Sequence, residues 1–495
     1  MNIKQLLKGY TYRIIHENEG QVIHGIQYDS RLVEAKDAFV AIKGFKVDGH
    51  DYIEKAISNG AGTIVCSDLG KVAHEIEKHG DIQWIFVEDT RNALAFLSDA
   101  FYQQPSKKIA LLGITGTNGK TSISLLLSNM LEALQKKTGV IGTIGNKVGD
   151  KSYQTSVTTP ESLNLNQLFD EMVKADVDAC LMEVSSHSLA LDRVAYLNYN
   201  IGIFTNLTQD HLDFHYDFED YYSAKRQLFF VTDTYNLINK DDRYGKRLIR
   251  DLQAHDIKAK TVTYGIDTPA DIMAKNVDYS MTGVSYDLSM DSFSMRVEVN
   301  MPGKIYVYNT LAAIGALVLM GATTKDIIKA VKGIKAVPGR FEQVENDKGI
   351  NVIVDYAHAP DALKNVLQIA NEFTDGRVIT VFGCGGDRDK GKRPLMGGIA
   401  LEESDYVVVT SDNPRTEDPD AIIKDIIVNY PQEGTYEVFS DRRQGIAAAI
   451  AYAKVGDTIV IAGKGHETYQ ILGKKKIAFD DRLIAQEYLA LKGEI

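Results

Sequence analysis

The sequence predicts an α/β protein built from three domains, and three observations support this. The chain has 495 residues, enough for about three domains of ~150 residues each. Strand-like apolar runs alternate with helical runs over most of the chain, which favours parallel sheets. A glycine-rich segment joins a strand to a helix near residue 116, and four strands near the C-terminus end in polar loops. We expect domains at residues 1–107, 108–333 and 334–495, the last with a doubly wound, Rossmann-like sheet.

Composition limits the classes of partner. Hydrophobic residues make up 44% of the chain and charged residues 25%, which is ordinary for a soluble globular protein. The net charge of −12 argues against a nucleic-acid partner, because phosphate backbones require a basic surface. No apolar run approaches the ~18 residues that span a membrane, and three scattered cysteines suit a reducing compartment. We expect a cytoplasmic monomer that binds neither nucleic acid nor membrane.

The first domain alternates strand-like runs, such as IHGIQYDS and GTIVCS, with helical runs such as DYIEKAISNGA. Within it, Ser30 lies between Asp29 and Arg31, directly after a predicted strand. Asp and Ser are frequent in turns and helix caps, so the residues alone favour a structural role for this site.

The segment LLGITGTNGKTS organises the central domain. An apolar strand ends in three glycines, a lysine and two hydroxyl residues, and an amphipathic helix follows. Gly116 and Gly119 let backbone N–H groups approach an anion. Lys120 can reach terminal phosphates, and the Thr121 hydroxyl can ligate Mg²⁺. The spacing departs from the usual P-loop, because five residues rather than four separate Gly113 from Gly119. We predict a P-loop-like, mononucleotide-binding domain.

Two further strands of the central domain end in polar clusters. The run ACLMEVSSHS carries Glu183, and the run IGIFTNLTQDHLDFH carries Asp210, His211 and Asp213. The carboxyl ends of parallel strands meet at one sheet edge, so we expect both clusters beside the glycine-rich segment. Glu183 and His211 are candidate Mg²⁺ ligands, although a carboxylate suits this ion better than an imidazole. Capping or hydrogen-bonded loop roles are the alternative for both residues.

The remainder of the central domain gives weaker signals. Lys225 lies in the helical run DFEDYYSAKRQLFF and, from the pattern alone, is a surface lysine. Alternating strands between residues 260 and 300 predict a small appended sheet, and VYNTLAAIGALVLMGA predicts a buried helix.

The third domain begins after KAVPGRFE, where Pro338 and Gly339 predict a linker. Four predicted strands end in the loops of VIVDYAHAPD, VITVFGCGGDRDK, DYVVVTSDNPRTEDP and TIVIAGKGHETYQ. Each side chain in these loops could by itself be a cap or a surface group, but a row of loops at one sheet edge predicts a binding cleft. The charged or amide side chains gathered there are Arg388, Asp412, Asn413, Arg415 and Glu467.

Seven motifs follow one another along the chain: ITGTNGKTS, MEVSSHSL, NLTQDHLDFH, DYAHAPDAL, GGDRDKGKRP, DNPRTEDP and AGKGHETYQ. In this order they resemble the Mur ligases, from Asp29 to about Gln470. Within this family, the set is most similar to the ligase that adds the third amino acid of the peptide. The acceptor of that amino acid is UDP-N-acetylmuramoyl-L-alanyl-D-glutamate. The resemblance implies an N-terminal domain for the uridine nucleotide, a central ATPase domain and a C-terminal domain for the incoming amino acid. It also implies ATP-driven amide bond formation through an acyl phosphate, with ATP and Mg²⁺ as cofactors.

The resemblance also implies roles for individual positions. Catalytic roles fall on Lys120, Glu183, His211 and Lys225, and Lys225 aligns with a lysine that similar enzymes carbamylate. The chain departs from the family's usual pattern at Val157, Leu191 and Ile305-Tyr306. The implied metal ligands are Thr121, Glu183, His211 and Lys225; the ATP-binding residues are Gly116, Thr117, Asn118, Gly119, Lys120, Thr121 and Ser122; the uridine-substrate residues are Ser30, Thr158, Thr159, Ser185 and Arg193; and the amino-acid-binding residues are Arg388, Asp412, Asn413, Pro414, Arg415, Gly463 and Glu467.

The loop Asp412-Asn413-Pro414-Arg415 resembles the form associated with meso-diaminopimelate, whereas relatives that add lysine usually lack the arginine. Diaminopimelate has a second carboxylate with which Arg415 can pair, and a buried arginine without a partner is costly. We expect UDP-N-acetylmuramoyl-dipeptide, meso-diaminopimelate and ATP as substrates. The alternatives are addition of L-lysine, another ligase of the superfamily such as folylpolyglutamate synthase, or a P-loop switch or transport ATPase.

Overall fold

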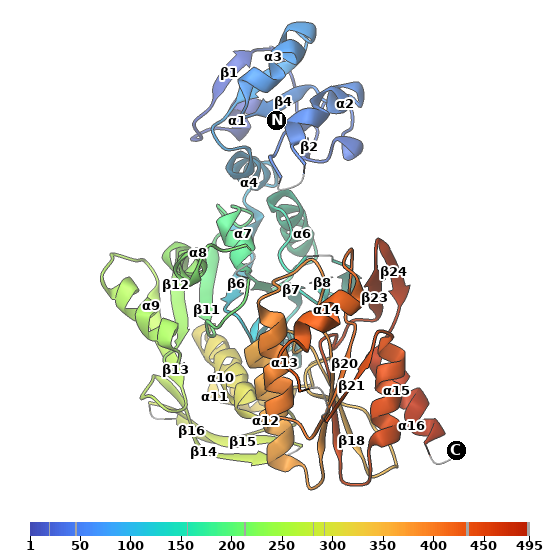
Figure 1. The fold of residues 1–495 in the computed structure, drawn as a ribbon. Coiled ribbons are helices and arrows are strands. Elements are labelled where there is room, and N and C mark those ends of the chain that lie inside the picture. Colours follow the sequence, from blue (N-terminus) through green and yellow to red (C-terminus); the bar gives the residue numbers. More distant parts are fainter. Residues whose placement is uncertain are drawn as a thin grey trace.

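The structure is a computed structural model that describes residues 1–18, 20–44, 47–155, 157–211, 214–280, 282–291, 293–431 and 435–492. Its large sheets have five, eleven and six strands, all mainly parallel and covered by helices, so the predicted α/β class is confirmed. The N-terminal domain stands at one end, and the C-terminal domain lies beside the central one (Figure 1). Each large sheet draws its strands from one of the three expected ranges, while the boundaries themselves stay a prediction.

The N-terminal sheet has the strand order β1-β5-β4-β3-β2, with β1 antiparallel to β5 and the other neighbours parallel. Ser30 begins a short 3₁₀ helix, Ser30–Leu32, and the Asp29 carboxylate accepts the backbone N–H of Arg31 at 3.0 Å. The capping role expected for this site is therefore present. The strands are Arg13–His16 (β1), Ile26–Gln27 (β2), Ala38–Val40 (β3), Thr63–Cys66 (β4) and Gln83–Phe86 (β5), and the helices are Ile3–Leu6 (α1), Ile53–Ser58 (α2), Leu69–Lys78 (α3) and Thr90–Phe101 (α4).

The central sheet runs in the order β16-β15-β14-β13-β12-β11-β6-β10-β7-β8-β9. Neighbours from β14 through β7 are parallel, and antiparallel hairpins extend both edges. The strands expected between residues 260 and 300 are present as β13 to β16. They do not form a small sheet of their own, because β13 pairs with both β12 and β14, so these strands extend the edge of the central sheet. The strands are Ala110–Thr115 (β6), Thr138–Gly142 (β7), Gly145–Val148 (β8), Lys151–Tyr153 (β9), Ala179–Glu183 (β10), Tyr199–Phe204 (β11), Thr232–Asn239 (β12), Lys260–Gly265 (β13), Ile272–Ser280 (β14), Gly283–Met290 (β15) and Phe293–Val299 (β16).

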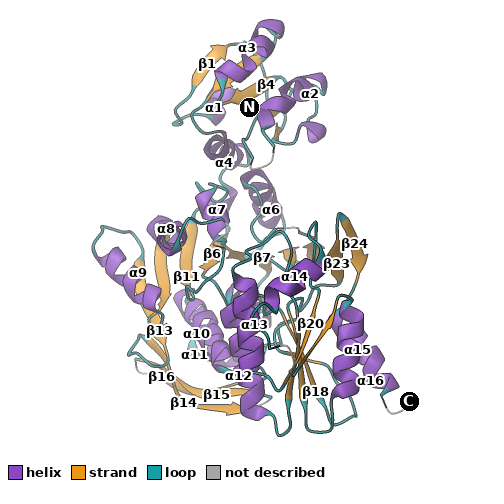
Figure 2. Ribbon diagram, viewed as in Figure 1, coloured by secondary structure: helices purple, strands orange, loops and turns teal. Residues whose placement is uncertain are grey.

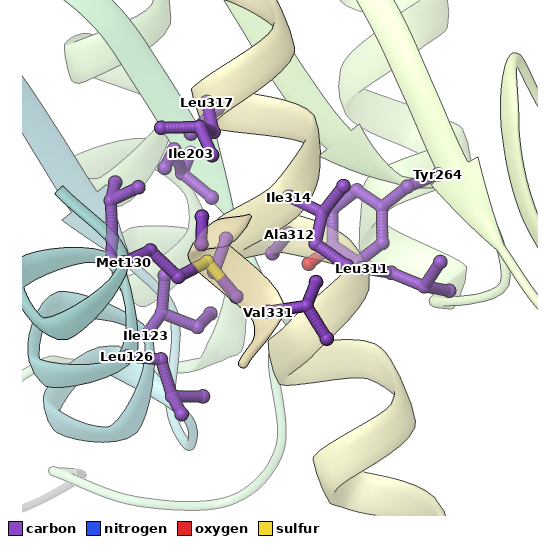
Figure 3. Packing of buried hydrophobic residues seen from close by; sticks show 14 of the residues in the cluster. Ile123, Leu126, Met130, Ile203, Tyr264, Leu311, Ala312, Ile314, Leu317 and Val331 are labelled. Carbon is purple, nitrogen blue, oxygen red and sulfur yellow. The ribbon is translucent and has the colours of Figure 1, made fainter. Parts of the chain in front are cut away.

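Two central helices form the core that supports the glycine-rich segment. Ile123, Leu126 and Met130 on the first of them, α5, point toward α10 and belong to the same buried cluster as Leu311 and Ile314 of α10, which lie beside Tyr264 (Figure 3). Burying one such side chain contributes about 1.5–3 kcal/mol, so this contact fixes the start of α5 relative to the sheet. The helices are Lys120–Ala133 (α5), Ser162–Lys174 (α6), Ser186–Ala190 (α7), Phe218–Val231 (α8), Arg243–Gln253 (α9), Lys304–Leu319 (α10) and Thr324–Val331 (α11).

The C-terminal sheet has the order β17-β18-β22-β19-β20-β21, parallel except for β17. Helices α12 to α14 cover one face and α15 and α16 the other, so the predicted doubly wound arrangement is confirmed (Figure 2). No helix of the described residues is long and apolar enough to cross a membrane. The strands are Glu342–Gln343 (β17), Asn351–Asp355 (β18), Val378–Phe382 (β19), Tyr406–Thr410 (β20), Tyr436–Phe439 (β21), Thr458–Ala462 (β22), Tyr469–Leu472 (β23) and Lys475–Ala478 (β24), and the helices are Pro360–Phe373 (α12), Lys392–Glu402 (α13), Pro419–Ile426 (α14), Arg442–Tyr452 (α15) and Asp481–Leu491 (α16).

Candidate active site

The glycine-rich segment forms a tight loop between β6 and α5. Gly119 precedes α5 with a φ of 91°, and Gly116 has a φ of 145°. The Lys120 ammonium donates to the carbonyl oxygens of Gly116 at 2.8 Å and Thr117 at 2.7 Å. Ser122 is buried in the first turn of the helix. Backbone N–H groups at a helix N-terminus beside a lysine make a phosphate-binding arrangement.

The end of β11 holds this loop in place. The backbone N–H of Thr117 donates to the carbonyl oxygen of Asn206 at 2.9 Å, and that of Asn118 donates to Asn206 Oδ1 at 2.9 Å. The Thr205 hydroxyl donates to the Asn118 carbonyl oxygen at 2.7 Å, and a side chain at Gly116 would collide with that hydroxyl. Thr205, which directly precedes the NLTQDHLDFH motif, was not among the expected site residues, whereas Asn206 is the first residue of that motif.

Glu183 ends β10 as a buried carboxylate next to the loop. It accepts the Thr121 hydroxyl at 2.9 Å, the Thr143 hydroxyl at 3.0 Å and the Thr143 backbone N–H at 3.0 Å. Mg²⁺ prefers hard oxygen ligands, and a carboxylate beside two hydroxyls supplies them. The donor set therefore fits this ion. Thr143 was missed because it lies in the unremarkable turn after β7.

His211 lies at the mouth of the same region with a backbone φ of 57°. Its Nε2 is 3.5 Å from Asp210 Oδ2, and burial lowers the pKa of the imidazole below its ordinary value. Asp213 lies outside the described residues. Among the residues that the structure describes, no group of three His, Cys, Asp or Glu side chains could hold a metal ion. The ligand set Thr121, Glu183, His211 and Lys225 stays a prediction.

Lys225 is buried, so the surface position suggested by the helix pattern was wrong. Its amine donates to the Gly116 carbonyl oxygen at 2.9 Å and lies 4.8 Å from the centre of the Tyr221 ring. Burial, and then the nearby Lys120 ammonium, hold the pKa of Lys225 well below its ordinary value. At neutral pH, a larger fraction of such an amine is uncharged than of a surface lysine. The uncharged amine has the lone pair that makes it a nucleophile.

One cavity of about 1140 Å³ joins the central and C-terminal domains. Predicted site residues from both of these domains line the cavity. Leu191 and Val157, where the chain departs from the family pattern, line it as well. The predicted site residues in its wall are Thr121, Thr158, Thr159, Glu183, Ser185, Arg193, His211, Arg388, Arg415 and Glu467. Ser30 is not among its lining residues and lies in the N-terminal domain.

The expected uridine-substrate residues of the central domain form one hydrogen-bonded group. Thr159 donates its hydroxyl to the Glu183 carbonyl oxygen at 2.8 Å, and Ser185 caps α7 by accepting the Ser188 N–H at 3.1 Å. Arg193 donates to the carbonyl oxygen of Thr159 at 3.2 Å. The Thr158 hydroxyl lies 3.1 Å from that of Thr143. These residues thus border the Glu183 carboxylate directly.

Two guanidinium groups face the cavity from the C-terminal domain. Arg415 has a φ of 52°, and its backbone pairs with the β23–β24 hairpin by accepting the Gly473 N–H at 2.7 Å and donating to Ile471 at 3.1 Å. Its side chain donates to the Gly386 carbonyl oxygen at 2.7 Å. Burial, and then Arg388, lower the pKa of Arg415. Within the described parts of the chain, neither arginine has a carboxylate partner. The pair is therefore available to an anionic ligand.

A buried network lies behind these arginines. The Lys464 ammonium donates to Glu467 Oε2 at 2.8 Å and to Asn413 Oδ1 at 3.2 Å, while Asn413 donates to the same Glu467 oxygen at 2.9 Å. Asp412 is buried too. Burial raises the pKa of its carboxyl group, whereas the cations Lys464 and Arg442 lower it, and the net result is a pKa below the ordinary value. Sequence reasoning missed Lys464, although it stands inside the AGKGHE motif.

Backbone geometry explains the other two expected amino-acid residues. Gly463 follows β22 with a φ of 116°, and a Cβ there would lie 2.6 Å from Asp412 Oδ2. Pro414 is buried and accepts the Glu417 N–H through its carbonyl oxygen at 3.1 Å. Both residues shape the loops and bring no charge of their own.

Comparisons with known proteins agree along the whole chain. Residues 22–102 match the Mur ligase family, catalytic domain; residues 114–317 match the Mur ligase middle domain; and residues 339–465 match the Mur ligase, glutamate ligase domain. The UDP-N-acetylmuramoyl-L-alanyl-D-glutamate--2,6-diaminopimelate ligase of Clostridioides difficile (strain 630) is 48% identical over 491 residues, covering 99% of this chain and 100% of that protein. The ligase of the same name from Clostridium botulinum is 46% identical, with 99% of each chain covered.

Solved structures share the fold. A UDP-N-acetylmuramoyl-L-alanyl-D-glutamate--2,6-diaminopimelate ligase superposes with a TM-score of 0.68 at 32% identity, covering 96% of this chain and 97% of the other. Folylpolyglutamate synthase of Mycobacterium tuberculosis, complexed with ADP and AMPPCP, gives 0.63 at 18% identity, covering 76% and 92%. At that identity the second likeness concerns the fold alone.

Proposed function

This chain belongs to the Mur ligase family, and we propose that it adds meso-diaminopimelate to the D-glutamate of UDP-N-acetylmuramoyl-L-alanyl-D-glutamate, using ATP, in peptidoglycan precursor synthesis. Full-length relatives at 43% to 48% identity carry the name of this activity. The observation that carries the choice of amino acid is the pair Arg388 and Arg415, which face the shared cavity without a carboxylate partner among the described residues.

The reaction joins a carboxylate to an amine, and hydroxide is too poor a leaving group for this to occur directly. An oxygen of the D-glutamate γ-carboxylate attacks the γ-phosphorus of ATP, so an acyl phosphate forms and ADP leaves. The amine of diaminopimelate then attacks the acyl carbon, giving a tetrahedral intermediate. Collapse of that intermediate releases phosphate and a proton. Lys120 and the N-terminus of α5 stabilise the negative charge on the transferring phosphoryl group.

The residues that would hold Mg²⁺ are Thr121, Glu183, His211 and a carbamylated Lys225. When bound, the ion neutralises phosphate charge and orients the two anions that must meet. The support for modification of Lys225 is its buried amine with a lowered pKa. The uncharged amine attacks the carbon of CO₂, an N–C bond forms, and one proton is released. The product is a carbamate, whose carboxylate group carries a negative charge where the uncharged amine had none.

Substrate selection divides between two sets of residues. Thr158, Thr159, Ser185 and Arg193 would bind the acceptor, with Ser30 contributing from the N-terminal domain. Arg415 and Arg388 would pair with the carboxylate that distinguishes diaminopimelate from lysine, and guanidinium suits that task because it binds carboxylates bidentately. Glu467, Asp412 and Asn413 would bind the ammonium that stays charged during the reaction. We also propose that the enzyme acts as a monomer in the cytoplasm, where ATP is available.

Phosphate release by the purified protein tests the proposal. With ATP and Mg²⁺ present, we expect release only when the acceptor nucleotide and meso-diaminopimelate are both added, and little with L-lysine. Turnover with lysine would shift the assignment to a lysine-adding ligase. Turnover with a folate and glutamate would favour a folylpolyglutamate synthase. ATP hydrolysis that needs no amino acid would favour a nucleotide switch.

A further inference from the structure

Glu161 stands between two arginines that belong to different domains. Its Oε1 lies 2.9 Å from Arg91 Nη1 in the N-terminal domain and 2.9 Å from Arg193 Nε in the central domain. The three side chains are 16%, 15% and 19% exposed for Arg91, Glu161 and Arg193, so solvent screens these pairs only partly. Helix α4, which carries Arg91, lies against the α6 region in Figure 1.

Local structure leaves the Glu161 carboxylate available for these contacts. Glu161 precedes α6 as its N-cap, yet its side chain makes no capping hydrogen bond. It follows the Thr158-Thr159-Pro160 turn, and Arg193 also donates to the carbonyl oxygen of Thr159 at 3.2 Å. The guanidinium is therefore held on two edges by one short segment. Arg193 lines the cavity, whereas Glu161 and Arg91 do not.

A second set of contacts surrounds the same place. Asn92, next to Arg91, donates to Asp192 Oδ2 at 2.9 Å and accepts the Tyr196 hydroxyl at 2.6 Å. The first turn of α4 thus contacts the segment that carries Arg193. Through Glu161, it is also linked to the guanidinium group of Arg193. The N-terminal domain thus supplies contacts to Glu161, which forms an ion pair with Arg193, and to Asp192, which precedes Arg193 in the chain.

We propose that Glu161 is a positioning residue that couples the N-terminal domain, through Arg91, to the orientation of Arg193 toward the acceptor nucleotide. The inference rests on the proposed function, in which Arg193 binds the acceptor. One carboxylate between two guanidiniums leaves one net positive charge, and this charge attracts an anionic group of the substrate. Glu161 acts through Arg193 and touches no reacting atom.

Steady-state kinetics of Glu161→Gln test the coupling. The amide keeps the size of the side chain but loses its charge. We expect KM for the acceptor to rise roughly tenfold while kcat and the KM values for ATP and diaminopimelate stay near wild type. Arg91→Gln, which alters only the N-terminal partner, shifts KM for the acceptor in the same direction. Glu54→Gln is the matched control, because Glu54 forms an exposed ion pair with Lys78 inside the N-terminal domain.

A double-mutant cycle separates positioning from simple domain adhesion. We expect Glu161→Gln with Arg91→Gln to raise KM for the acceptor little beyond the larger single effect, because both changes break one coupled unit. Additive effects, an equal rise in all three KM values, or a lowered Tm with unchanged kinetics would overturn the proposal. Failure of the proposed function is distinguishable, since wild-type protein would then release no phosphate with acceptor and diaminopimelate.

Discussion

Lys464 donates a 2.8 Å hydrogen bond to Glu467 from a position in which the lysine side chain has no exposed surface. The same ammonium lowers the pKa of Asp412, so one lysine compensates two carboxylates at the proposed amino-acid site. One negative charge would then remain for the ammonium of the amino acid that we propose binds here. This buried lysine sets the charge balance of the site.

Replacing Lys464 tests this balance. In Lys464→Met the two carboxylates repel each other and Glu467 loses a buried partner, so we expect KM for diaminopimelate to rise roughly tenfold or more. KM for ATP should stay near wild type. Lys454→Met on the exposed loop after α15 serves as the control. An unchanged KM for diaminopimelate in a folded Lys464→Met protein would contradict this prediction.

Removing the guanidinium of Arg415 should affect one substrate only. We expect Arg415→Ala to lower kcat/KM for diaminopimelate by roughly 30-fold or more, because a largely desolvated charge pair is lost. The dissociation constant for ATP, measured by calorimetry, should change little, since the nucleotide loop lies in the central domain. Arg443→Ala is the matched control, because Arg443 on α15 forms an exposed ion pair with Glu487 on α16. Equal losses for both ligands would argue against this role.

A side chain at Gly116 should damage the nucleotide loop. In Gly116→Ala the new methyl group would collide with the Thr205 hydroxyl, and the φ of 145° is unfavourable for alanine. We expect ATP binding to weaken by roughly tenfold or more, as measured by fluorescent nucleotide titration. Gly398→Ala is the control, because a Cβ at that position on α13 meets nothing within 4 Å. Wild-type ATP affinity in Gly116→Ala would show that the loop tolerates the change.

The His466 imidazole should make folding sensitive to mild acid. Burial, followed by the cations Arg340 and Arg482, lowers the pKa of His466 from 6.5 to about 4. Below pH 6.5 the unfolded chain takes up a proton that the folded protein takes up only near pH 4. The histidine's contribution to the free energy of unfolding is thus complete above pH 6.5 and is lost as the pH falls toward 4.

We expect His466→Gln to lose less thermal stability than wild type when the pH is lowered from 7 to 5. Differential scanning calorimetry at both pH values measures this. His24→Gln, on the exposed surface of the N-terminal domain, should behave as wild type. The same drop in Tm for wild type and His466→Gln would show that this histidine does not contribute.

The fold class and the family could be predicted because their signals are local. Strand ends, glycine positions and the DNPR loop can each be recognised from a few consecutive residues. In a parallel sheet, the carboxyl ends of the strands then meet at one edge. The strands of residues 260–300 were predicted, but their pairing with the central sheet was not, for the opposite reason. Alternation predicts a strand, but whether that strand pairs with β12 or forms a new sheet depends on partners elsewhere in the chain.

By itself, the sequence determined the α/β class, the Mur ligase family and the position of the glycine-rich loop between a strand and a helix. Only the tertiary structure decided which charged residues are buried. Lys225 has the helical context of a surface lysine, yet it contacts Gly116 across 109 positions of sequence. Lys464 with Asn413, and Glu161 with Arg91, likewise join residues 51 and 70 positions apart. Burial removes water and so strengthens the electrostatic interactions of each charged group. Which groups are buried depends on which distant segments pack together, and a local sequence pattern does not show this.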